Sequence, residues 1–176
     1  MDKHINCLIK HPTTTDPCIK KNDLYIIEQP VRMRVKRIIV TSHTVQYNCL
    51  LKLYQTIAFD EMQTYISEIK NKLNGYKHQD REKKRSIDNI ISYDDVIEKL
   101  ITSHMQCYYC NCNVNILYSN VKQENQWTLE RINNDIGHTN GNCEVCCLRC
   151  NLKRRCIPSY LYKNSKKIGK IVKLGD

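Results

Sequence analysis

The chain has 176 residues, 41% of them hydrophobic, and a formal net charge of +10. This length suits one ordinary domain or a small domain with an attached module, and the charge favours a polyanionic partner over an acidic protein. No apolar run is long enough to span a membrane, and the N-terminus lacks the apolar core of a secretory signal. We therefore expect an intracellular protein in a reducing compartment, with no membrane partner.

The first 40 residues predict loose structure followed by two strands. Residues 1–22 contain two prolines and a run of threonines, and strands are expected at 24–28 and 31–40. In the second strand, apolar and basic residues alternate, as Val31, Met33 and Val35 do with Arg32, Arg34 and Lys36. This is the period of a half-buried strand. Its basic face would be either a solvated surface or a contact for phosphates.

Two helices are predicted next. A stripe of apolar residues recurs at three- and four-residue steps through 47–74, and Gly75 is expected to end this helix. Residues 77–85 are charged and contain no aliphatic side chain, so they predict a linker. A second helix, at about 93–104, should begin after Ser92, with Asp95 completing a capping box.

Two Cys-x-x-Cys pairs follow, Cys107 with Cys110 and Cys147 with Cys150. One such turn can present two thiolates to a metal ion, and two turns complete a closed tetrahedral Zn²⁺ site. In a chain with 11 cysteines and no secretory signal, such spacing indicates metal ligands more than disulfides. We therefore predict a structural zinc site at these four residues.

The second pair has a competitor, because Cys143 and Cys146 have the same spacing and Cys112 and Cys156 lie nearby. The segment 142–147 reads as a strand that ends at a turn, and thiols within a strand point to alternate faces. Cys150, by contrast, leads directly into the helix-compatible basic run 151–155. These features favour the 147/150 pair, while reduced cysteines without a metal remain the alternative.

The segment between the cysteine pairs carries Leu-Glu-Arg-Ile at 129–132, Gly-His at 137–138, Asn142, and Cys-Asn at 150–151. Taken with the cysteine pairs, this order resembles the HNH, or ββα-metal, endonucleases. It is most similar to the zinc-bound variants of phages and large DNA viruses, including the endonuclease VII type of junction resolvase. The resemblance covers about 60 residues by the spacing of these motifs. It implies DNA as the partner and, for a viral protein, the host nucleus or cytoplasm.

The resemblance also implies roles for single residues. Glu130 and Asn151 fall on the family's ligands of a catalytic Mg²⁺ or Mn²⁺ ion, for which oxygen donors are suitable. Asn142 falls on the central Asn that orients the general base. The first His of the family pattern is replaced by Arg131, and an expected Asp by Asn133. His138 and Asp135 then remain as candidate bases, with loop packing or phosphate contact as the alternative for His138.

Basic residues follow Cys150. Lys153, Arg154 and Arg155 are expected to contact a nucleic-acid backbone, as is Arg131, whose guanidinium stays protonated. The residues expected at the site are then Glu130, His138, Asn142 and Asn151 for catalysis, with Glu130 and Asn151 also on the divalent metal.

The predicted fold is α+β, with three parts: an N-terminal strand and helix region at 1–85, a zinc-stabilised ββα-metal module at 86–160, and a basic tail at 161–176. The N-terminal region would select substrate, mediate a homodimer or support the module. Three functions compete for this fold: a metal-dependent endonuclease, an inactive zinc-dependent nucleic-acid-binding factor, and a zinc-dependent protein adaptor. The adaptor leaves the basic segments unexplained.

Overall fold

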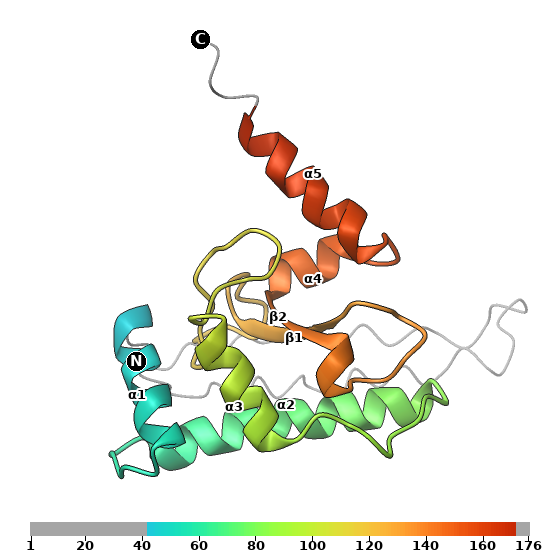
Figure 1. The fold of residues 1–176 in the computed structure, drawn as a ribbon. Coiled ribbons are helices and arrows are strands. Elements are labelled where there is room, and N and C mark those ends of the chain that lie inside the picture. Colours follow the sequence, from blue (N-terminus) through green and yellow to red (C-terminus); the bar gives the residue numbers. More distant parts are fainter. Residues whose placement is uncertain (1–41, 172–176) are drawn as a thin grey trace, which may run out of the picture. The chain divides into compact units, whose positions relative to one another are not determined.

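The computed structural model describes residues 42–171, with side chains to residue 168 (Figure 1). All described residues belong to one compact unit, Val35–Asp176. The strands expected at 24–28 and 31–40 lie outside the described residues. Within them, the architecture is mixed helix and strand, as predicted. In chain order the main elements are α1 (His43–Tyr54), α2 (Met62–Glu82), α3 (Tyr93–Thr102), β1 (Trp127–Arg131), β2 (Cys143–Cys147), α4 (Leu148–Arg154) and α5 (Ser159–Ile171).

The single helix predicted at 47–74 is instead two helices, α1 and α2. The chain leaves the helical path after Tyr54, and Thr56 adopts a left-handed backbone conformation with φ 58°. The apolar stripe is therefore divided between two helices that both contact α3. Leu50 of α1 and Ile69 of α2 are fully buried in the same core. The periodicity identified the buried face, but it could not reveal the turn within it.

The predicted stop at Gly75 and the predicted linker at 77–85 are wrong, because α2 continues to Glu82. Glycine lowers helix stability by only about 1 kcal/mol relative to alanine, which tertiary contacts readily offset. The later turns of α2 make such contacts. The Tyr76 hydroxyl accepts a hydrogen bond from the backbone N–H of Leu129 in β1 at 2.9 Å, and Asp80 is completely buried.

Helix α3 has the predicted start. Ser92 is its N-cap and Asp95 completes the capping box, with reciprocal hydrogen bonds of 3.1 and 3.0 Å. Its apolar face, which includes Val96 and Leu100, is buried. The helix ends two residues earlier than predicted, at Thr102, and the chain then enters the first cysteine pair.

Strands β1 and β2 form an antiparallel hairpin in which Trp127 pairs with Cys147 and Arg131 with Cys143. Helix α4 begins immediately after β2, so the order is strand, strand, helix. Both strands contact α4, and α2 reaches β1 from another direction (Figure 1). The Lys72 ammonium of α2 is hydrogen-bonded to the Trp127 carbonyl and lies 4.9 Å from the centre of the Trp127 ring. Burial lowers the pKa of Lys72 to about 7.

Helix α5 crosses the boundary expected at residue 160 and makes part of the predicted tail helical. Its first turns pack on the first cysteine turn, where Tyr109 contacts Ser159 through hydroxyl oxygens 3.1 Å apart and the ring of Tyr162 at 5.0 Å. Among residues 42–171, no helix has the length and apolar character needed to cross a membrane.

Candidate metal centre and adjoining pockets

The four predicted cysteines converge. The Sγ atoms of Cys107, Cys110, Cys147 and Cys150 all lie within 4.8 Å of one another, and three of the four residues are buried. Tetrahedral Zn²⁺ with bonds of about 2.3 Å requires sulfur atoms about 3.8 Å apart. The sulfurs of Cys110 and Cys147 are 3.9 Å apart, close to that requirement. The cluster can therefore hold a metal ion such as zinc.

Local structure explains why each turn presents two thiols. Cys147 is the last residue of β2 and the N-cap of α4, and its Sγ accepts the backbone N–H of Cys150 at 3.4 Å. The first turn closes through the hydrogen bond from the Asn111 N–H to the Cys107 carbonyl at 2.9 Å. The Tyr108 N–H donates to the Val145 carbonyl of β2 at 2.8 Å, which holds the two turns together.

The alternative pair, Cys143 and Cys146, does not form the four-thiol group. Both residues lie within β2, so the strand geometry separates them as predicted. Cys146 nevertheless lies beside the cluster, with its Sγ 3.7 Å from that of Cys107. Cys156 is exposed.

A pocket of about 540 Å³ adjoins the hairpin and α4. It brings together residues from four separate segments, and five residues predicted for the site are among those that line it: Glu130, Arg131, His138, Asn151 and Arg155. We refer to it as the hairpin pocket.

His138 enters this pocket from the loop between the strands, and Asp80 holds it there. The Asp80 carboxylate accepts the His138 backbone N–H at 2.6 Å and contacts ring Nδ1 at 2.8 Å. Tyr76 stacks on the imidazole with ring centres 4.5 Å apart. Because a carboxylate can only accept, Nδ1 carries the proton and Nε2 keeps its lone pair. Burial lowers the pKa of His138, although Asp80 opposes that change.

Glu130, which the sequence predicts as a ligand of the divalent metal, contacts a basic side chain in this structure. Its carboxylate pairs with the guanidinium of Arg154, and both side chains are buried. Burial raises the pKa of Glu130, and the adjacent Arg154 opposes that shift. Arg154 also donates to the backbone carbonyls of Arg131 at 2.9 Å and Ile132 at 3.0 Å. Arg154 therefore holds α4 against the end of β1.

The two asparagines have distinct positions. Asn151 donates through Nδ2 to Thr128 Oγ1 at 3.2 Å, at the edge of the hairpin pocket. Asn142 is buried and closes the loop between the strands. Its Oδ1 accepts the Asn133 N–H at 2.9 Å, and its Nδ2 donates to the Asn133 carbonyl at 2.9 Å and the Gly137 carbonyl at 3.0 Å. This arrangement fixes the loop that carries His138.

The predicted nucleic-acid contacts divide into exposed and buried residues. Lys153 and Arg155 are exposed. Arg131 is largely covered and lies 3.5 Å from Asp80. Arg154 is 1% exposed, so the prediction that it contacts a nucleic-acid backbone is corrected to a structural role. Its guanidinium pairs with the Glu130 carboxylate, and the positive charge of Arg131 acts on the same carboxylate from a greater distance.

Asp80 is a site residue that the sequence did not predict, because the charged composition of residues 77–85 is typical of a linker. A signal was present. Residues at three- and four-residue steps from Ile69, namely Leu73, Tyr76 and Asp80, continue one face of the helix. A carboxylate at the end of an apolar stripe indicates a buried acid that needs a partner.

No protein-family model, no curated protein and no solved structure matches the chain.

Proposed function

We propose that the chain is a metal-dependent endonuclease of the HNH, ββα-metal kind, which hydrolyses DNA phosphodiester bonds beside a structural zinc site. The observation that carries the proposal is the convergence of Glu130, His138 and Asn151, from a strand, a loop and a helix, on one pocket. The cysteine cluster supports it, because Cys147 and Cys150 fix the start of the helix that carries Asn151.

The oxygen atoms in the hairpin pocket suit a hard cation such as Mg²⁺ or Mn²⁺. Asn151 uses its Nδ2 for hydrogen bonds, and its Oδ1 has none within the described residues. The Glu130 carboxylate has enough lone pairs to accept both Arg154 and a cation. Mg²⁺ commonly binds one or two protein oxygens and keeps several waters. When bound, such an ion stabilises negative charge on the phosphate and on the leaving oxygen.

His138 is the general base in this proposal. Its Nε2 accepts a proton from water as the water oxygen bonds to phosphorus and the bond to the leaving oxygen breaks. The lowered pKa of His138 keeps the ring neutral near pH 7, which a base requires. Arg131 and Arg155 line the same pocket and supply positive charge for a phosphate.

A second function, binding of nucleic acid without cleavage, is favoured by one observation. The Glu130 carboxylate already has a cationic partner in Arg154. If Arg154 neutralises enough of the Glu130 charge to prevent a divalent cation from binding, the pocket binds DNA without cutting it. The cysteine cluster and the exposed basic residues would then serve binding alone.

Cleavage of supercoiled plasmid and of branched DNA, with and without Mg²⁺, separates the two functions. The variants are Glu130→Ala, Asn151→Ala and His138→Gln, each checked for an unchanged zinc content. Asn120→Ala is the matched control, because Asn120 is exposed and lies outside the pocket. The endonuclease predicts nicking that needs Mg²⁺, is lost in the three variants and is kept in the control. DNA binding without nicking, across several divalent metals, would establish the second function instead.

A further inference from the structure

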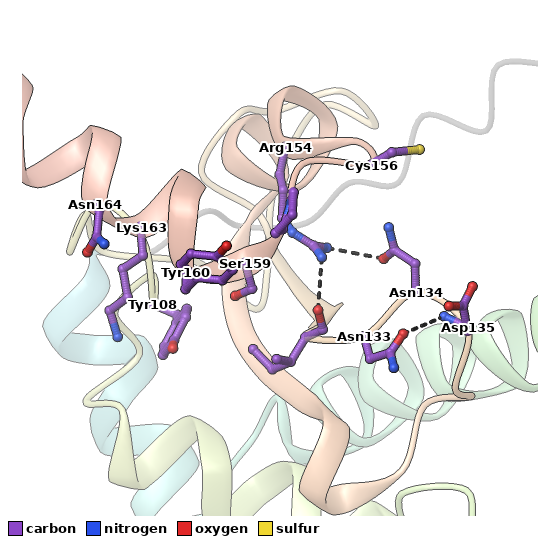
Figure 2. Close-up of a pocket in the computed structure, with 12 residues that line it drawn as sticks. Tyr108, Asn133, Asn134, Asp135, Arg154, Cys156, Ser159, Tyr160, Lys163 and Asn164 are labelled. Carbon is purple, nitrogen blue, oxygen red and sulfur yellow. Dashed lines mark hydrogen bonds between the residues drawn. The ribbon is translucent and has the colours of Figure 1, made fainter.

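We infer that a second pocket, between the loop at 132–135 and the start of α5, binds one unpaired nucleobase of the nucleic acid. The inference rests on the proposed function and names its substrate class: nucleic acid with an unpaired or displaced base beside the phosphate that enters the hairpin pocket. This base pocket has a volume of about 630 Å³. Figure 2 shows Tyr160, Lys163 and Asn164 on one side of it and Asn133, Asn134 and Asp135 on the other.

The wall of the base pocket differs from that of the hairpin pocket. Arg85, Arg131 and Arg155 line the hairpin pocket, as a phosphate site requires. The base pocket is lined mainly by two tyrosines, a proline, an isoleucine and three asparagines. Its charged residues are the exposed Asp135, the half-buried Lys163 and the buried Arg154. Aromatic rings with amide groups suit a planar, uncharged heterocycle, because bases are recognised by stacking and by hydrogen bonds to their edges.

Tyr160 is the stacking residue. Its side chain is 67% exposed at the rim, and it has no ring contact within the described residues. Tyr108, the other tyrosine, is covered, because Lys163 Nζ lies 3.4 Å from the centre of its ring. Tyr160 therefore offers a free aromatic face, whereas Lys163 occupies one face of the Tyr108 ring.

Unused hydrogen-bonding groups surround the same space. Arg154 lines the base pocket, and its Nε–H is buried with no hydrogen-bond partner in the described part of the structure. Asn133 uses its side-chain oxygen to accept the Asp135 N–H at 2.9 Å, which leaves its Nδ2 donor free (Figure 2). The Asn133 Nδ2 group can therefore donate a hydrogen bond to the edge of a base in this pocket.

The two pockets are neighbours. Asn134 and Cys156 line both of them, and Asn134 also accepts a hydrogen bond from Arg154 at 3.2 Å. A nucleotide whose phosphate lies among the arginines can therefore place its base on Tyr160 only if the base leaves the helical stack. Unstacking costs the least free energy for a base that is already unpaired. The geometry thus selects unpaired sites over continuous duplex.

The test compares two DNA duplexes of equal length, one fully paired and one with a single unpaired 2-aminopurine. Binding of the full-length, zinc-loaded protein is measured without Mg²⁺, by anisotropy and by 2-aminopurine fluorescence. We expect tighter binding to the unpaired site, with quenching of the 2-aminopurine. Tyr160→Ala should weaken binding to the unpaired site about tenfold, since the base loses the aromatic ring on which it stacks. It should weaken binding to paired duplex less than twofold.

Tyr54→Ala is the control, because Tyr54 is 61% exposed and lies on α1, outside both pockets. It should change neither affinity. Equal wild-type affinity for the two duplexes, equal losses with Tyr160→Ala, or no binding to either duplex would overturn the inference. The proposed endonuclease activity is read separately, as cleavage after Mg²⁺ is added. Quenching without cleavage would therefore reject the endonuclease and retain the base pocket.

Discussion

Asp80 and His138 lie 58 positions apart in the chain, and one oxygen of the Asp80 carboxylate contacts both the ring Nδ1 and the backbone N–H of His138. The other oxygen faces Arg85 at 3.6 Å and Arg131 at 3.5 Å. A single buried carboxylate thus sets the tautomer of the candidate base and lies close to two cations at the hairpin pocket. It also joins α2 to the loop between β1 and β2.

Asp80→Asn should test this relationship. The Asp80 carboxylate raises the pKa of His138 against the larger effect of burial, so its loss should lower that pKa further. Under the proposed function, the cleavage rate falls in acid because His138 is protonated. In the variant, this fall should occur at a lower pH. Stability should fall by about 1–3 kcal/mol because two partly buried arginines and His138 lose the buried carboxylate that contacts them. Asp88→Asn, at an exposed acid, is the control, and an unshifted profile in Asp80→Asn would remove His138 from the reaction.

Acid should weaken the fold through His138. Its folded pKa lies below the ordinary value of 6.5, so the unfolded chain binds the proton first as the pH falls. The free energy of unfolding should therefore decrease as the pH drops through about 6.5 and level off below the folded pKa. Urea midpoints between pH 8 and pH 5 measure this. In His138→Gln, the free energy of unfolding should decrease less over this pH range. An equal decrease in the wild type and the variant would show that His138 does not cause the loss of stability in acid.

Arg154→Met should be strongly destabilising. It leaves the buried Glu130 carboxylate without its cation, a change that typically costs about 3–5 kcal/mol. Combining it with Glu130→Gln should restore part of that loss. The exposed pair Arg149 and Glu124, 3.4 Å apart, provides the control, because Arg149→Met should cost less than about 1 kcal/mol. Similar losses for the two arginine variants in urea denaturation would show that the Glu130 pair is not buried in solution.

Metal removal should unfold residues 105–156 and leave α2 largely helical. Structural zinc in small modules contributes about 10–16 kcal/mol of apparent binding energy, which is comparable with the total stability of a typical domain. Circular dichroism and hydrogen exchange after chelation, with metal loss verified, measure the change. The Cys150→Ser variant should bind zinc far more weakly, whereas the exposed Cys156→Ser should bind it normally. An unchanged spectrum after verified metal loss would rule out a structural role.

Gly137→Ala should disturb the loop that carries His138. A Cβ atom at this position would lie 2.7 Å from the Ser86 carbonyl oxygen and 3.1 Å from Asp80 Oδ2. The required shift should cost about 1–3 kcal/mol, as overpacking usually does. Gly141→Ala is the matched control, because no atom lies within 4 Å of its added Cβ. Thermal unfolding distinguishes the two, and equal stability would show that the loop adjusts freely.

The sequence was sufficient wherever the determining interactions are local. The capping box of Ser92 and Asp95 spans four residues, and each cysteine turn depends on a spacing of three, so both could be predicted from neighbouring positions. The choice of Cys147 over Cys143 was predictable for the same reason, since a strand and a helix start present thiols differently.

Tertiary structure alone decided the features that depend on distant partners. The turn at Thr56, the continuation of α2 through Gly75 and the burial of Arg154 follow from packing against segments far along the chain. Residue type and spacing identified Glu130 as acidic and Arg154 as basic, but could not show that they pair with each other. Charge in a sequence is a local property, whereas the partner of a buried charge is fixed only when the core closes around it.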